Sequence, residues 1–483
     1  MEVSDMTPEI ESFIKKFSEE IKNNNAAVFA GAGFSKPAGY VDWKELLRDV
    51  ADDLQLDVNK EDDLVTLSQY YCNKNSRNAL DEIVNNEFTK NKRIDENHQI
   101  VAKLPICTYW TTNYDSLIED ALTQKGRVVD VKRNNNSFST TLKDRDAIVY
   151  KMHGDKTDPS DVVLIKDDYE TYYRKHKQFI TALTADLITK TFLFVGFSFK
   201  DPNLDYILSR IHVDYRENNR IHYALVKKPQ LEDYGDDEDL FKYQETKFHL
   251  FIDDLKRRYN IHPLLLDNYS QITTILKEIE QRVNSSNVFI SGSAHEYGDF
   301  SRDEAESLIK DLSKTLINKG YNIISGFGLG VGSYVITGAL EEIYMQGHKI
   351  KDDQLILRPF PQDIENKEDR IKLWTKYRHD MISRAGISIF MFGNKLNDQG
   401  EVVKANGVRS EYEIAKEYHN IMIPVGCTDY VANDIWHQMK DHLEDYYGPV
   451  NADLEKCFDL LNVKLSNQEI IDNIMKIIKI IRK

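Results

Sequence analysis

Four short motifs combine glycine with polar side chains that can bind or cleave a nucleotide, and each follows an apolar run. They are residues 31–35 (GAGFS), 112–115 (TNYD), 153–154 (HG) and 196–198 (GFS). Glycines in the first motif let the backbone approach a pyrophosphate closely, and free N–H groups there can bind its oxygens. Since a purely structural tight turn has the same composition, this motif alone leaves both interpretations open.

Asn113 and His153 are the residues that we predict to carry the chemistry. An oriented amide can hold ribose hydroxyls or a water molecule, and a histidine near neutral pH can act as a base or polarise a hydroxyl group. Structural alternatives stay open: Asn113 as the side chain of an Asx turn, and His153 as a hydrogen-bonded core histidine. Asp115 also has an alternative role, because it can cap a helix predicted from Ser116.

The hydrophobic pattern predicts the elements that position these motifs. Buried strands are predicted from apolar runs at 26–30, 104–110, 147–152, 192–195, 222–226 and 262–266. Helices are predicted at 10–23, 43–54, 62–88 with a break near 73–75, 250–259 and 272–283. The acidic segment 231–240 is predicted to be a surface loop. Because ligands bind beyond the carboxyl ends of the strands in an open α/β sheet, the four motifs can converge on one crevice.

A second α/β pattern begins after the polar stretch 284–287, which we interpret as a domain boundary. Its strands are predicted at 288–290, 322–324, 355–357, 387–392 and 421–425, and its helices include 303–318 and 334–345. Glycine turns of the phosphate-binding type follow the first two strands, at 291–294 and 325–332. The sequence therefore predicts two α/β domains, residues 1–283 and 284–483, each with a nucleotide-type site.

Composition excludes several classes of function. The chain has 483 residues with a formal net charge of -16, which argues against nonspecific nucleic-acid binding and attachment to an acidic membrane. No apolar run is long enough to span a bilayer, the acidic N-terminus does not resemble a signal peptide, and the apolar segment 470–481 is predicted to be a packing helix. The four cysteines form no C-x-x-C pair, so we expect reduced thiols, a cytoplasmic protein and no metal site.

The motifs of the first half resemble the sirtuin family in type and order. The resemblance implies a Rossmann-type domain that binds NAD+, with Asn113 and His153 as catalytic residues. The NAD+-binding positions that it implies are Ala32, Gly33, Ser35, Asp115, Gly196 and Ser198. The chain lacks the four-cysteine zinc module of sirtuin deacylases and the arginine expected at 37–43. With no acyl-lysine acceptor, the resemblance implies water as the acceptor and hydrolysis of NAD+ to nicotinamide and ADP-ribose.

The second half resembles the SLOG superfamily of phosphoribohydrolases and nucleotide sensors. The positions implied to bind a nucleotide signal are Ser291, Gly292, Gly328, Gly330, Arg378, Lys395 and Glu411. A guanidinium such as that of Arg378 suits a pyrophosphate, a carboxylate such as Glu411 suits ribose hydroxyls, and Lys395 is expected in a loop after Phe392. The alternatives are a surface ion pair for Arg378 and a solvated lysine for Lys395. Enzymes of the superfamily carry Pro-Gly-Gly where this chain has 405–407 (ANG), which argues against hydrolase activity there.

This pair of domains resembles the effectors of Thoeris anti-phage defence. The resemblance implies that a partner TIR-domain protein makes a cyclic ADP-ribose isomer, that the SLOG domain binds it, and that the sirtuin-like domain then depletes NAD+. It also implies a homo-oligomer, typically a tetramer that can assemble further. Other functions stay open: an NAD-dependent deacylase or ADP-ribosyltransferase, a phosphoribohydrolase built on Arg378 and Glu411, and a nucleotide sensor without enzymatic activity.

Overall fold

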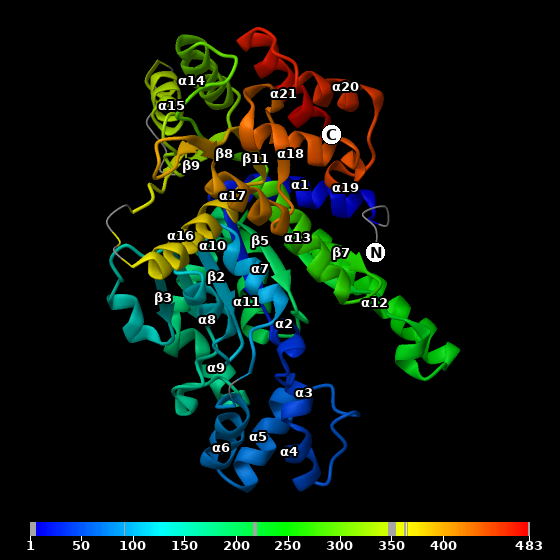
Figure 1. The fold of residues 1–483 in the computed structure, drawn as a ribbon. Helices are drawn as coiled ribbons and strands as arrows, with labels where there is room; N and C mark the ends of the chain where they lie inside the picture. The colour runs from blue at the N-terminus through cyan, green and yellow to red at the C-terminus, as the bar shows by residue number, and fades with distance from the viewer. Residues whose placement is uncertain are drawn as a thin grey trace. The chain divides into compact units, whose positions relative to one another are not determined.

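The computed structural model describes residues 6–90, 92–215, 220–345, 354–361, 364 and 366–481. The chain divides into two compact units, Met1–Glu280 and Gln281–Lys483, and each contains its own parallel sheet flanked by helices (Figure 1). The α/β class predicted for both halves is confirmed. The predicted domain boundary at 283–284 lies near this division, at the end of helix α13, and the extent of each functional domain stays a prediction.

The first unit is built on a seven-stranded parallel sheet in the order β3-β4-β2-β1-β5-β6-β7. Its strands are β1 (Ala26–Ala30), β2 (Thr108–Thr111), β3 (Val129–Lys132), β4 (Ala147–Lys151), β5 (Thr191–Val195), β6 (His222–Lys227) and β7 (Ile261–Leu266). Every residue of β1, β2 and β5 is buried, as expected for central parallel strands covered on both faces. That burial explains why their apolar runs were readable in the sequence.

Helices cover this sheet and also form a separate group (Figure 1). They are α1 (Pro8–Lys22), α2 (Ala32–Ser35), α3 (Trp43–Leu46), α4 (Arg48–Asp53), α5 (Leu64–Lys74), α6 (Arg77–Phe88), α7 (Glu96–Lys103), α8 (Leu117–Gln124), α9 (Lys166–Lys175), α10 (Lys177–Thr189), α11 (Pro202–Tyr215), α12 (Glu238–Tyr259) and α13 (Ser270–Asn284). The group α3–α6 packs around its own apolar cluster, which includes Val50, Leu67, Leu80 and Val84. An apolar core therefore stabilises this part of the unit.

Several predicted elements of the first unit differ from the structure, among them the strand predicted at 104–110, which begins only at Thr108. The turn at 31–35 is already helical, because α2 begins at Ala32 directly after β1. The helix predicted at 43–54 is two helices, which meet at Leu47. The loop predicted at 231–240 holds the start of α12, since the Asp237 carboxylate accepts hydrogen bonds from the N–H groups of Asp239 and Leu240 and starts that helix early.

The second unit has a five-stranded parallel sheet in the order β10-β9-β8-β11-β14. Its strands are β8 (Asn287–Ser293), β9 (Asn322–Ser325), β10 (Leu355–Leu357), β11 (Ile387–Phe392) and β14 (Ile421–Pro424), beside an antiparallel ribbon of β12 (Asn394–Leu396) and β13 (Val402–Lys404). Its helices are α14 (Arg302–Asn318), α15 (Gly332–Met345), α16 (Lys367–Ile382), α17 (Asn406–Glu417), α18 (Tyr430–Lys440), α19 (Leu443–Tyr447), α20 (Ala452–Leu460) and α21 (Asn467–Ile481).

The last helix, α21, packs into the core of the second unit. Five of its isoleucines are buried: Ile470, Ile471, Ile474, Ile477 and Ile478. The predicted packing role of this apolar segment is thereby confirmed. Within the described ranges, no helix combines the length and the apolar character that crossing a bilayer would require.

The loops after β1 and β5 touch through their backbones. The N–H of Gly31 donates to the Val195 carbonyl at 3.0 Å, and the N–H of Gly33 donates to the Gly196 carbonyl at 2.9 Å. A Cβ added to Gly196, whose φ is +63°, would lie 2.1 Å from the backbone nitrogen of Phe34. Glycine is therefore required at this contact both by the backbone angle and by the close approach of the two loops.

We predict that Gly196→Ala destabilises the first unit far more than Gly126→Ala. Gly126 has a similar positive φ of +76°, but a Cβ there would meet nothing within 4 Å. The control should lose about 1 kcal/mol of unfolding free energy to backbone strain. Gly196→Ala should lose about 2 kcal/mol more, because the methyl group collides with backbone. Urea denaturation measures the loss of unfolding free energy in each variant. Equal losses in the two variants would contradict the close contact between the β1 and β5 loops.

Candidate functional site

Strand β1 lies where the connections of the first sheet reverse direction. β2 pairs with one of its edges and β5 with the other, all in parallel. Such a switch point opens a crevice beyond the carboxyl ends of the strands, where ligands bind in open α/β sheets. The four motifs that we singled out follow β1, β2, β4 and β5, so the topology brings them to this edge (Figure 1).

A cavity of about 1590 Å³ occupies this edge of the first unit. It is bordered by five of the predicted positions: Ala32, Gly33, His153, Gly196 and Ser198. A second space of about 30 Å³ is bordered by the other three: Ser35, Asn113 and Asp115. Ala32 and Thr112 border both spaces, so the two adjoin. The smaller space has room for about one water molecule.

The Asn113 amide is held in one orientation. Its Nδ2 donates to the Gly31 carbonyl and to Ser35 Oγ, each at 3.0 Å, and its backbone N–H donates to Thr111 Oγ1 at 2.9 Å. Its buried Oδ1 has no hydrogen-bond partner among the described residues. Since both donors of the amide are used, the free oxygen is the atom left to bind a ligand or water. The amide bridges two loops, which an Asx turn would not do.

His153 borders the large cavity of the first unit. It follows β4, is 2% exposed, and its ring meets Tyr169 edge-on at 5.5 Å between centroids. An Asp201 carboxylate oxygen lies 3.2 Å from Nε2, yet this nitrogen has no hydrogen-bond partner in the part of the chain that the structure describes. Burial lowers the pKa of His153 below the ordinary histidine value, although Asp201 opposes the shift. A neutral imidazole with a free nitrogen can accept a proton.

Asp115 has the capping contact that its structural alternative predicted. Its Oδ1 accepts a hydrogen bond at 3.0 Å from the N–H of Leu117, the first residue of α8.

The N–H groups of the first glycine motif, which we expected to be free, are largely used within the protein. Those of Gly31 and Gly33 donate to the β5 loop, and that of Phe34 donates to the Gly31 carbonyl. These glycines therefore let two loops approach each other, and a bound phosphate needs other donors.

The structure adds three residues that the sequence did not single out. Asn203 is 8% exposed and borders the cavity, and its Nδ2 is buried without a hydrogen-bond partner among the described residues. The side chains of Lys200 and Lys247 border the same cavity, and neither forms an ion pair in the described part of the chain. For Lys200 and Asn203 the sequence signal was the segment 200–203 (KDPN), which closely follows the glycine motif, whereas Lys247 had no such signal. These groups can supply donors to an anion in an otherwise acidic protein.

A pair of opposite charges, largely shielded from solvent, lies in the second unit. Arg378 Nε is 3.5 Å from Glu411 Oε1, and Glu411 accepts a hydrogen bond from Ser291 Oγ at 2.6 Å. The guanidinium carbon lies 5.0 Å from the ring centroid of Phe360. Arg378 is thus not the surface ion pair of the structural alternative. Burial raises the pKa of Glu411, whereas Ser291 and Arg378 act in the opposite direction.

The glycine turns of the second unit are also sites of close backbone approach. A Cβ on Gly328 would lie 1.9 Å from the Gly292 carbonyl oxygen, and one on Gly330 would lie 1.9 Å from the Ala294 carbonyl oxygen. Ser291 and Gly292 lie within β8 rather than in a turn, because β11 pairs with β8 along its full length.

Lys395 lies on the antiparallel ribbon, not in a loop. It is part of β12, opposite Val403 of β13, and its side chain is exposed. The predicted loop position is wrong because 402–404 returns antiparallel to 394–396 and pairs with it. The structure places Ser291 and Arg378 each in contact with Glu411, and no contact joins Lys395 to these three described residues.

Metal-binding groups are absent from the described ranges. No three His, Cys, Asp or Glu side chains there come together in a way that could hold a metal ion. The four cysteines are separate free thiols, and Cys427 and Cys457 are buried.

Comparisons with known proteins match both units. Residues 108–252 match the SIR2-like domain, and residues 271–481 match the Sir2- and TIR-associating SLOG family. The chain is 51% identical to the NAD(+) hydrolase ThsA of Bacillus cereus (strain MSX-D12), over 99% of each chain. It is 43% identical to that of Acinetobacter baumannii (strain 532279), over 97% of this chain and 98% of the relative. Defense-associated sirtuin 2 of Bacillus subtilis is 26% identical over 41% of this chain and 20% of its own.

We predict that His153 stays uncharged at pH values where an exposed histidine is already protonated. Its lowered pKa follows from burial, so the unfolded chain binds this proton more readily and the fold loses stability as the pH falls through the ordinary histidine value. Asp201→Asn should lower the pKa of His153 further, because the carboxylate favours the charged ring. Histidine hydrogen–deuterium exchange measured by mass spectrometry reports the pKa of His153 in the wild type and in Asp201→Asn. An unchanged or higher pKa in Asp201→Asn would refute this electrostatic description.

Proposed function

The chain belongs to the family of NAD(+) hydrolases named ThsA, and on that premise we propose that its first unit cleaves NAD+ when a nucleotide signal binds the second. The observation that carries the proposal is a pair of buried polar atoms at adjoining spaces, Asn113 Oδ1 and His153 Nε2, neither of which has a hydrogen-bond partner among the described residues. The enzyme is an NAD+ glycohydrolase, and its relatives support a role in defence.

NAD+ would occupy the large cavity of the first unit. Its volume of about 1590 Å³ exceeds that of a typical small-molecule pocket, and so it can take a dinucleotide. Ala32, Gly33, Gly196 and Ser198 would contact the substrate from two loops. The ammonium groups of Lys200 and Lys247 would attract its pyrophosphate. Ser35 would act by orienting Asn113, and Asp115 by fixing the start of α8.

Cleavage breaks the bond between nicotinamide and ribose, and positive charge develops on the ribose. Asn113 Oδ1 would hold a water molecule or a ribose hydroxyl, because it is the free acceptor of a fixed amide. Water adds to the ribose carbon that nicotinamide leaves. Neutral His153 accepts the proton released in this step, and the Asp201 carboxylate at 3.2 Å stabilises the imidazolium. The products are nicotinamide and ADP-ribose, and no metal is needed.

The signal would bind beside Arg378 in the second unit. Arg378 offers a guanidinium whose Nε is buried and without a hydrogen-bond partner among the described residues. A cyclic ADP-ribose isomer carries the pyrophosphate and ribose groups that Arg378 and Glu411 suit. A partner TIR-domain synthase would supply it, and the match of the second unit to the Sir2- and TIR-associating SLOG family supports this source. We further propose a cytoplasmic homo-oligomer, a tetramer or a higher assembly, with access to the NAD+ pool.

We predict that Asn113→Ala lowers the rate of nicotinamide release by about a hundredfold or more, because the ordered acceptor is lost. Asn420→Ala is the matched control, since its Nδ2 also donates to a backbone carbonyl (Ile382, 3.2 Å) and to a serine hydroxyl (Ser388, 3.0 Å). The control should keep the rate within about threefold. Release of nicotinamide from NAD+ is measured with a panel of cyclic ADP-ribose isomers present. Full activity of Asn113→Ala would refute the assignment, and release dependent on an acyl peptide would favour a deacylase.

We predict that Arg378→Ala abolishes the response to the signal while the first unit stays folded. Arg384→Ala, which removes only a surface ion pair with Asp380 at 2.9 Å, should respond normally. Because a signal shifts activity only through unequal affinity for the two states, loss of its binding contact removes the shift. The readout is the ratio of nicotinamide release with and without the isomers. A wild-type ratio in Arg378→Ala would place the signal elsewhere.

A further inference from the structure

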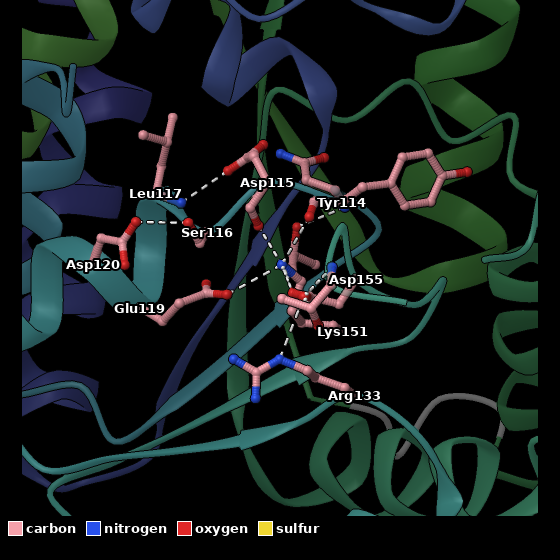
Figure 2. Close-up of polar contacts among 12 residues, drawn as sticks. Tyr114, Asp115, Ser116, Leu117, Glu119, Asp120, Arg133, Lys151 and Asp155 are labelled. Atoms are coloured by element: carbon pink, nitrogen blue, oxygen red, sulfur yellow. Dashed lines mark hydrogen bonds and ion pairs between the residues drawn. The ribbon is translucent and has the colours of Figure 1, made fainter. Parts of the chain in front are cut away.

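The Lys151 ammonium is buried at the end of β4, directly before the His153 loop. Its residue is 0% exposed, and oxygens from three segments surround its Nζ (Figure 2). Nζ donates to the backbone carbonyls of Tyr114, at 3.2 Å, and of Asp115, and to Glu119 Oε1 at 3.1 Å. Asp155 Oδ2 completes the set as an ion pair at 2.5 Å. Three hydrogen bonds use all the protons of an ammonium group.

Two of these segments carry the proposed chemistry. The carbonyls of Tyr114 and Asp115 belong to the loop that begins with Asn113, and Asp155 lies two residues after His153. The Asp155 side chain is itself fixed, because its Oδ1 accepts hydrogen bonds from the Thr157 N–H at 2.9 Å and from the Thr157 hydroxyl at 2.6 Å. A single buried cation thus connects the Asn113 loop with the His153 loop (Figure 2).

We propose that Lys151 is a positioning residue for NAD+ cleavage, whose ammonium fixes the separation between the loops of Asn113 and His153. The inference rests on the roles proposed above for those two residues. Lys151 does not border the cavity and would touch no substrate. It acts by holding two backbone carbonyls and one carboxylate that move with the reacting side chains. A displacement of about 1 Å in such loops is enough to slow catalysis a hundredfold.

The charge balance around Nζ supports a permanent cation. Burial opposes the charged form of Lys151, but Glu119 and Asp155 together raise its pKa. Burial also opposes the charged form of Asp155, yet the Lys151 ammonium and Thr157 hold its pKa below the ordinary value. Half-buried Arg133, with Nε at 3.5 Å from Asp155, is a second and weaker partner. An apolar side chain at 151 would leave both carboxylates without this partner and the two carbonyls without a donor.

The first test compares Lys151→Met with Lys132→Met. Lys132 is also buried, pairs with Asp130 at 2.9 Å, and donates to the carbonyls of Ser137 and Thr140, but it contacts neither loop. Both variants should lower the thermal midpoint. Nicotinamide release from NAD+, with the panel of cyclic ADP-ribose isomers present, should show a kcat loss of about tenfold to a hundredfold with little change of KM only in Lys151→Met.

The pH profile separates positioning from stability. Loosening the loops lets water reach His153, which raises its pKa toward the ordinary value, so the acid limb of kcat should move to higher pH in Lys151→Met. Lys132→Met should keep the wild-type limb. The inference would be overturned if folded Lys151→Met kept the kcat and the pH profile of the wild type while Asn113→Ala was inactive. An active Asn113→Ala would instead refute the proposed function.

A milder pair of variants covers the case in which Lys151→Met does not fold. Asp155→Asn weakens the link to the His153 loop, whereas Glu119→Gln weakens the link to α8 and leaves both loops connected. Both substitutions replace a carboxylate that contacts the Lys151 ammonium with an amide of the same shape. Asp155→Asn should lower kcat about tenfold with KM unchanged, and Glu119→Gln should stay within about twofold of the wild type. Equal kcat values for the two would overturn the inference.

Discussion

The backbone contact between the β1 and β5 loops is the constraint on which the first site depends. The Gly33 N–H reaches the Gly196 carbonyl at 2.9 Å, and no side chain fits between the two loops. This contact fixes the Gly31 carbonyl, which in turn accepts a hydrogen bond from the Asn113 amide. The orientation of the free Asn113 oxygen therefore follows from the packing of glycines two strands apart. The motif has the composition of a phosphate-binding turn, but the N–H groups of Gly31 and Gly33 join the two segments and that of Phe34 donates within the motif.

Both units place buried charges beside their proposed sites. These charges are Lys151 and Asp155 in the first unit, and Arg378 and Glu411 in the second unit. Burying a charge is costly unless it is paired and hydrogen-bonded, and removing one partner of such a pair leaves the other charge uncompensated. In a chain of net charge -16, local cations also determine where an anion can bind. Charge placement thus links the packing of each unit to the ligand that it can accept.

The sequence predicted the parts of the fold that are buried on both faces. β1 and β5 are continuous apolar runs, so both were found, whereas the short β3 was not, because Asp130 and Lys132 interrupt its apolar residues. The site motifs were found because they follow central strands. What was missed depends on tertiary contacts. Lys151 ends an apolar strand, and only the fold shows four oxygens around it. Asn203 is significant because its buried amide nitrogen has no hydrogen-bond partner in the described part of the chain.

The most direct test of this account is nicotinamide release from NAD+ by the purified wild-type protein, with and without each cyclic ADP-ribose isomer. ADP-ribose should be quantified in the same samples. The account predicts that at least one isomer starts release, and that nicotinamide and ADP-ribose then form in equal amounts. No release with any isomer or with none would contradict it, because the Asn113 and His153 pair would then have no hydrolytic function.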